Sequence, residues 1–147
     1  MNLNGALSLK NHQAIVLEEK TIHYKATIKL FKRLLKKHLK GKIHLILDNA
    51  SHHHHHTLKP FLKKHRRLKT VFLPTYSPNL NLIERLWRFF HQKVTNNHYF
   101  ETFDEFRKTS LKFFKNLDIP VRNCFSDFPA SNLPENQFLK CIITKKN

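Results

Sequence analysis

Residues 43–48 have the sequence IHLILD, an apolar run that only His44 interrupts and that Asp48 ends. A short apolar run that follows a helical pattern is typical of a strand buried in a parallel sheet. Functional groups of α/β proteins gather beyond the carboxyl ends of such strands. Asp48 therefore stands where a functional carboxylate is expected, although Asp48 and Asn49 could equally close the strand with an Asx turn.

Two short strands and one helix are predicted before this run. The strands are expected at Asn2–Leu9 and Ala14–Leu17. Apolar residues from Ile28 to Leu39 then recur at steps of three and four, which predicts an amphipathic helix with Gly41 as its left-handed stop. Lysine and arginine fill the opposite face of this helix, and that face either lies in solvent or faces DNA.

The pattern after Asp48 alternates helices with one more strand, so the whole order is that of an α/β protein. Trp87 belongs to an apolar helical stripe and is therefore expected in the core. A loop-rich C-terminal tail with three prolines is expected from 118 to 147. The other predicted elements are a basic helix at Leu58–Arg67, a strand at Lys69–Leu73, a stiff loop between Pro74 and Pro78, a helix from Ile83 to Val94, and a helix that runs from a Thr102–Glu105 capping box to about Asn116.

The charge of the chain predicts a polyanionic partner. Lysine and arginine number 27 against 10 acidic residues, and the formal net charge is +17 over 147 residues. Nucleic acid is the first expectation, although ribosomal and membrane-surface proteins share this composition. No apolar run is long enough to span a membrane, and no secretory signal is visible. Cys124 and Cys141 lack metal-site spacing, which is typical of reduced thiols in a cytoplasmic protein.

Asp48 and Glu84 are the two acidic residues in unusual positions. If the strands that end at Asp48 and Leu73 are neighbours, both carboxylates converge at one edge of the sheet. Mg²⁺ prefers oxygen ligands, so two carboxylates beside a phosphate backbone predict a divalent-metal site for phosphoryl transfer. Glu84 also has a structural interpretation, as the third residue of a capping box that begins at Asn81.

Two longer motifs carry a resemblance to a known family. Residues 46–50 read ILDNA, and residues 73–87 read LPTYSPNLNLIERLW. Together they resemble the mariner-like insertion-sequence transposases of the DDE superfamily, and residues 2–7 are similar to the second strand of that catalytic domain. The similarity runs from Asn2 to about Phe114. The separation of 84 − 48 = 36 positions between the two acids also fits the family.

The resemblance implies a ribonuclease H-like fold with a catalytic triad of two aspartates and a third acid. Asp48 matches the second acid and Glu84 the third. Their implied role is to hold Mg²⁺ or Mn²⁺ for cleavage of DNA at transposon ends and for strand transfer to target DNA. The implied partners are DNA and a second transposase chain, and the implied location is the cytoplasm, at the nucleoid.

The resemblance also predicts what is missing from this chain. The first aspartate of the family lies on a strand that would precede Asn2–Leu9, and the helix-turn-helix region lies earlier still. We therefore expect residues 1–117 to form a partial catalytic domain of an incomplete fold, whose first, central strand is missing. Unpaired strand edges, marginal stability and no activity of the chain alone would follow.

Two further interpretations stay open on the sequence. The chain could be a non-catalytic DNA-binding remnant of a decayed transposase, or a basic structural protein, which the motif at 73–87 disfavours. Residues His52–His56 form a run of five histidines. A solvated start of a helix is the expected structure there, with part of the run positioning the site, whereas a metal site made of histidine alone is not favoured.

Overall fold

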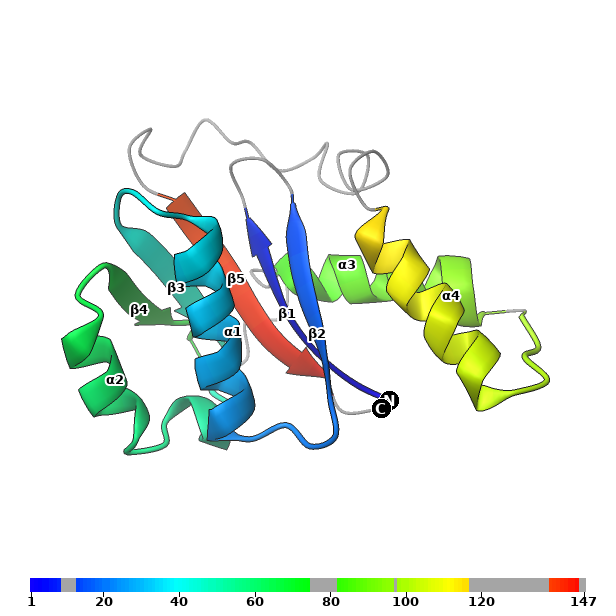
Figure 1. Ribbon diagram of the computed structural model, residues 1–147, viewed down its shortest axis with the longest axis horizontal. Helices are drawn as coiled ribbons and strands as arrows, with labels where there is room; N and C mark the ends of the chain where they lie inside the picture. The colour runs from blue at the N-terminus through cyan, green and yellow to red at the C-terminus, as the bar shows by residue number, and fades with distance from the viewer. Residues whose placement is uncertain (9–12, 75–81, 97, 117–137, 146–147) are drawn as a thin grey trace.

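The computed structural model describes residues 1–8, 13–74, 82–96, 98–116 and 138–145 of the chain. Within these ranges the protein is a mixed α/β structure built on one five-stranded sheet, in the order β2-β1-β5-β3-β4 (Figure 1). The elements are β1 (Asn2–Ser8), β2 (Ala14–Glu19), α1 (Tyr24–Lys37), β3 (Ile43–Leu47), the 3₁₀ turn η1 (Ser51–His53), α2 (Leu58–Lys64), β4 (Leu68–Phe72), α3 (Leu82–Phe90), the π-helical turn η3 (His91–Thr95), α4 (Phe103–Lys115) and β5 (Phe138–Lys145).

Most predicted elements are confirmed within a few residues. The α4 helix begins as expected, because the Thr102 hydroxyl accepts a hydrogen bond from the Glu105 amide at 3.2 Å. The α1 helix ends earlier than predicted, at Lys37, and the His38 amide there donates to the Leu34 carbonyl. Gly41 does adopt a positive φ of 79°, but it lies in the turn before β3 and does not stop the helix.

The expected pairing of the strands that precede Asp48 and the Pro74 loop is confirmed. β3 and β4 are parallel neighbours, and their register places Leu47 beside Phe72. Both strands therefore end at the same edge of the sheet, which is the condition for their following residues to form one site. Residues 75–81, which include most of the predicted stiff loop, lie outside the described residues.

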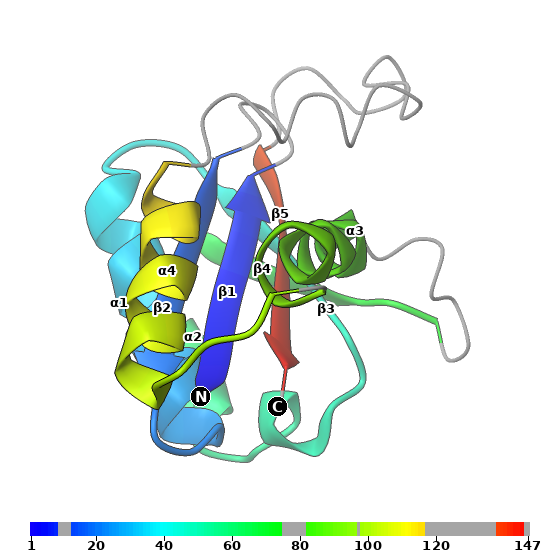
Figure 2. The ribbon, with the colours of Figure 1, turned by 90° about the vertical axis from the view of Figure 1, so that its right-hand side faces the viewer.

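Helices cover both faces of the sheet (Figure 2). One face packs against α1 and α2 around a core that includes Leu30, Phe31 and Leu45. The other face packs against α3, and Phe114 of α4 joins that core. Trp87 is only 1% exposed and meets Phe114 edge to face at a ring distance of 5.5 Å, which confirms it as a core residue.

Gly5 in β1 is the residue on which the indole of Trp87 lies. A methyl group added at Gly5 would approach the Trp87 ring to 3.2 Å, which is closer than ordinary packing allows. Because the indole is buried and packed against Phe114, we expect Gly5→Val to displace it and to destabilise the fold by about 1–3 kcal/mol through overpacking. Urea denaturation followed by tryptophan fluorescence would measure this loss, and equal stability of the two proteins would contradict the packing.

The centre of the sheet differs from the sequence expectation. β5 lies between β1 and β3, antiparallel to β1 and parallel to β3. The predicted gap at the central strand, with its unpaired edges, is therefore not present, because residues 138–145 fill it. These residues also depart from the loop-rich tail predicted for 118–147, whereas 118–137 lie outside the described residues. Periodicity could not predict this strand, because its pairing depends on partners far away in the sequence.

Candidate active site

Asp48 lies directly beyond the carboxyl end of β3, as the sequence predicts. One carboxylate oxygen, Oδ1, accepts a hydrogen bond from the Ala50 amide at 3.1 Å and another from the His53 Nδ1 atom at 2.7 Å. The bond from the Ala50 amide forms the Asx turn that the sequence also suggested, so Asp48 does close the end of the strand. The other oxygen, Oδ2, makes no hydrogen bond with another described residue, and the side chain is 30% exposed. Asp48 can therefore close the strand and still offer an oxygen to a ligand.

The surroundings of Asp48 keep its carboxylate ionised. Partial burial by itself would raise the pKa of Asp48, but the hydrogen bond from His53, the attraction to that ring and the bond from the Ala50 amide outweigh it. The net result is a pKa below the ordinary value of 3.8. A negatively charged oxygen at the end of a strand suits a hard cation such as Mg²⁺.

This lowered pKa makes the stability of the fold depend on pH in a predictable direction. Asp48 binds protons less readily in the folded chain than in the unfolded chain, so its contribution is complete well above pH 3.8 and is lost as the pH falls through the folded pKa. We expect the stability advantage of the wild type over Asp48→Asn to stay constant at higher pH and to shrink below pH 3.8. Urea denaturation of both proteins at a series of pH values measures this difference in the free energy of unfolding. A difference that grows as the pH falls would contradict the lowered pKa of Asp48.

His53 is a site residue that the sequence alone did not single out. It is 3% exposed, unlike the solvated residue expected at the start of a helix, and its Nδ1 atom must donate because an ionised carboxylate only accepts. The neighbouring histidines make other contacts: His54 stacks on Phe72, and His55 stacks on Tyr24 at a ring distance of 4.0 Å. Only the three-dimensional contacts separate His53 from four identical neighbours.

Asn49 ties the ends of the two parallel strands together. Its side-chain amide donates to the Leu73 carbonyl at 2.7 Å, and the Leu73 amide donates to the Leu47 carbonyl at 2.8 Å. The chain therefore leaves β4 beside Asp48 on its way to α3. This arrangement gives Asn49 a positioning role that its place in the motif did not reveal.

Glu84 lies in the first turn of α3, as predicted, and its side chain is partly buried. It lines a groove of about 520 Å³ together with Arg88, His91 and Asn96. Asp48 does not line this groove, and no described contact joins the two carboxylates. Convergence of Asp48 and Glu84 on one metal therefore stays a prediction.

The described residues contain no cluster of three or more histidine, cysteine, aspartate or glutamate side chains that could hold a metal. A divalent cation would thus have Asp48 and Glu84 as its predicted protein ligands and would take its remaining oxygens from water and phosphate, as Mg²⁺ commonly does. The Oδ2 atom of Asp48, which accepts no hydrogen bond from the described residues, fits such a cation. His52–His56 are among the described residues, and they form no such cluster there.

The family is established by comparison with known proteins. Residues 1–107 match the sequence model of the DDE superfamily endonuclease family. The matched part includes Asp48, Glu84 and all of β1 to β4. This chain therefore belongs to the DDE superfamily endonucleases.

The chain is similar to two curated proteins, one of which is named after an insertion element. It is 38% identical over 72 residues to the protein named "Insertion element IS630 uncharacterized 39 kDa protein" of Shigella sonnei. It is 36% identical over 61 residues to "Uncharacterized protein y4pE/y4sA" of Sinorhizobium fredii (strain NBRC 101917 / NGR234). The aligned parts cover 48% and 42% of this chain but only 21% and 42% of those relatives. No solved structure matches the chain.

No helix in the described ranges is both long and apolar enough to cross a membrane.

Proposed function

We propose that this chain is the C-terminal part of the catalytic domain of an insertion-sequence transposase of the mariner-like group, with a ribonuclease H-like fold. In the complete enzyme it would take part in DNA cleavage at transposon ends and in strand transfer. The observation that carries this proposal is the ionised Asp48 beyond β3, whose Oδ2 atom bonds to no other described residue, beside a parallel strand whose following segment leads to Glu84. Membership of the DDE superfamily endonucleases supports the same reaction class.

Asp48 and Glu84 are the proposed catalytic residues and the proposed ligands of Mg²⁺ or Mn²⁺. A divalent cation held there would neutralise charge on the scissile phosphate and lower the pKa of a bound water. His53 would orient Asp48 by holding its Oδ1 atom, which leaves Oδ2 directed to the ligand. Asn49 would keep the ends of β3 and β4 together so that both carboxylates approach the same phosphate.

Nucleic acid is the proposed partner, in the form of transposon-end and target DNA, with a second transposase chain as a further partner. A net charge of +17 suits such a polyanion. The proposed location is the cytoplasm, at the nucleoid. Residues 1–117 would be the partial catalytic domain, and 118–147 would be a C-terminal segment whose strand β5 joins the sheet of that domain.

We propose that this chain alone does not cleave DNA. β5 completes the sheet between β1 and β3, but the segment FLKCIITK contains no acidic residue. It therefore restores the backbone pairing of the sheet without supplying a carboxylate next to β3. The same feature favours the second candidate function, a DNA-binding remnant without catalysis.

Paramagnetic mapping with Mn²⁺ tests the proposed metal site. Substoichiometric Mn²⁺ should broaden the amide signals of residues 48–50 and 83–86 most strongly in ¹⁵N-edited spectra of the whole chain. Broadening at only one of the two segments, or broadening centred on His52–His56, would overturn the shared site. A parallel assay should find no Mn²⁺-dependent nicking of DNA that carries the ends of the element, whereas nicking would overturn the proposed inactivity.

A further inference from the structure

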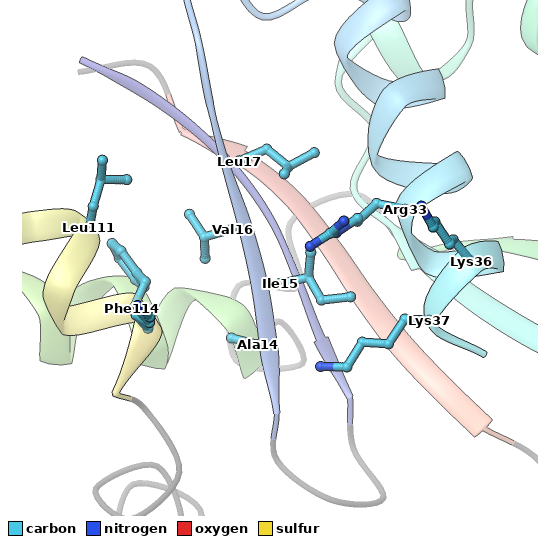
Figure 3. A pocket seen from close by; sticks show the side chains of 10 residues that line it. Ala14, Ile15, Val16, Leu17, Arg33, Lys36, Lys37, Leu111 and Phe114 are labelled. Carbon is cyan, nitrogen blue, oxygen red and sulfur yellow. The ribbon is translucent and has the colours of Figure 1, made fainter.

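A groove of about 610 Å³ lies along the outer edge of the sheet, between α1 and α4. Its floor is the first four residues of β2, Ala14–Leu17, and Figure 3 shows this strand between the two helices. Arg33 and Lys37 reach from α1 towards the strand, and Leu111 and Phe114 of α4 face it from the other side (Figure 3). The groove is thus apolar along its floor and basic along its rim.

Four cations line this groove, and none of its lining residues is acidic. Arg33, Lys36 and Lys37 come from the last turns of α1, and Lys115 ends α4. All four are exposed, and within the described ranges none of them makes an ion pair. A solvated surface usually mixes both charges, so four cations without an ion-pair partner among the described residues favour an anionic ligand in this groove.

The acidic residues of the same strand are neutralised elsewhere. Glu18 pairs with Arg107 at 2.8 Å, and Glu19 pairs with Lys29 at 2.8 Å. Among the described residues, no acidic side chain lines the groove, so the electrostatic potential there is set by its four cations.

β2 is also an edge strand of the sheet, so it leaves one row of backbone groups without a partner strand. Backbone N–H groups and basic side chains are the donors that proteins use to bind the phosphates of nucleic acid. An apolar peptide would not need the three cations of the α1 wall or Lys115 of the α4 wall, and a small acid would not need cations spread along an open groove.

We propose that this groove binds the phosphate backbone of nucleic acid. The inference rests on the proposed DNA partner but not on the proposed metal site. β1 and β5 separate β2 from β3, so at about 4.8 Å between neighbouring strands the groove lies roughly 14 Å across the sheet from the end of β3. The groove would therefore be a DNA-contact surface separate from the proposed metal site. It would bind the part of the DNA that extends beyond Asp48.

Salt-dependent DNA binding of the full chain tests the proposal. The groove variant combines Arg33→Gln, Lys36→Gln and Lys37→Gln. Its matched control combines Lys59→Gln, Lys63→Gln and Lys64→Gln on α2, which removes the same charge from another exposed helix. Fluorescence anisotropy with a labelled random 20-base-pair duplex would be measured from about 50 to 300 mM KCl in EDTA, so that metal binding plays no part.

The groove variant should weaken DNA binding at least about tenfold at 100 mM salt and reduce the slope of log K against log salt by roughly 2–3. The control should change affinity less than about threefold. An equal loss of DNA affinity in both variants would indicate a general effect of charge and would contradict binding at the groove. Unchanged DNA affinity in both variants would contradict it as well. If the groove variant still binds DNA with the affinity of the wild type, the groove is not a DNA-binding surface, but the proposed function is unaffected.

A second variant covers the case in which the triple variant does not fold. Lys115→Gln changes only the opposite wall and should lower the salt slope by about 1. An unchanged slope in Lys115→Gln would overturn the role of α4 in the groove. Circular dichroism of every variant separates loss of binding from loss of fold.

Discussion

Removal of Phe138–Lys145 is expected to unfold this protein or to drive it into aggregates at 25 °C. β5 pairs with β1 over six residue pairs and with β3 over five, so the deletion breaks both ladders at the centre of the sheet. On the order of ten ladder hydrogen bonds at about 1 kcal/mol each is comparable with the whole stability of a small domain, about 5–15 kcal/mol. Far-ultraviolet circular dichroism and size-exclusion chromatography would measure the loss. A truncated chain with unchanged secondary structure and melting temperature would contradict the central position of β5.

A cysteine pair can test the register of β5 without removing it. Leu7 lies opposite Cys141 in the antiparallel β1–β5 ladder. Directly opposed residues of such a ladder have Cα atoms about 4.5–5.5 Å apart, which is within the range of a disulfide. Leu7→Cys, in a background with Cys124→Ser, should therefore form a disulfide with Cys141 within one chain on mild oxidation.

The matched control for this cysteine is Leu3→Cys. Leu3 belongs to the same strand and the same buried cluster as Leu7, but its opposite residue is Lys145. Mass spectrometry of non-reduced peptides should find the link from position 7 to Cys141 and none from position 3. Links that form equally from both positions, or only between two chains, would contradict an ordered β5 within one molecule.

The second large effect is expected for Asp48→Asn. We expect this substitution to weaken Mn²⁺ binding by at least about 10–100-fold, because even residues that only support a metal ligand cause losses of that size. The amide of asparagine keeps the shape of the side chain but loses the charge that a hard cation requires. Mn²⁺ titration followed by electron paramagnetic resonance would measure the change in the wild type and in the variant.

Asp104→Asn is the control for the loss of one negative charge. Asp104 is an exposed acid on α4 that pairs with Lys108, in a different element from the site. It should leave Mn²⁺ binding unchanged. In EDTA, Asp48→Asn should leave DNA affinity equal or slightly raised, because it removes a negative charge from a chain that we propose to bind DNA. A sharp fall in metal-free DNA affinity would instead assign Asp48 to the fold or to direct DNA contact.

Local patterns in the sequence were sufficient for most of the elements and for the position of Asp48 at the end of β3. The apolar run before Asp48 predicted a strand in a parallel pair, and that pair is present in register. The Thr102 cap predicted the start of α4, and the stripe of Trp87 predicted a core helix. These features depend on neighbours within one or two turns of the chain, so short-range periodicity and capping chemistry carry the information.

Long-range contacts decided the rest of the structure. The sequence predicted an incomplete sheet, but β5 joins β1 and β3 from the far end of the chain, through pairings that no local pattern encodes. The sequence does not distinguish the five consecutive histidines from one another. Only its burial and its hydrogen bond to Asp48 set His53 apart. The basic groove likewise requires α1 and α4, two helices far apart in the sequence, to lie on either side of β2. Tertiary packing, which brings distant charges and strand edges together, therefore determines where this protein can bind a partner.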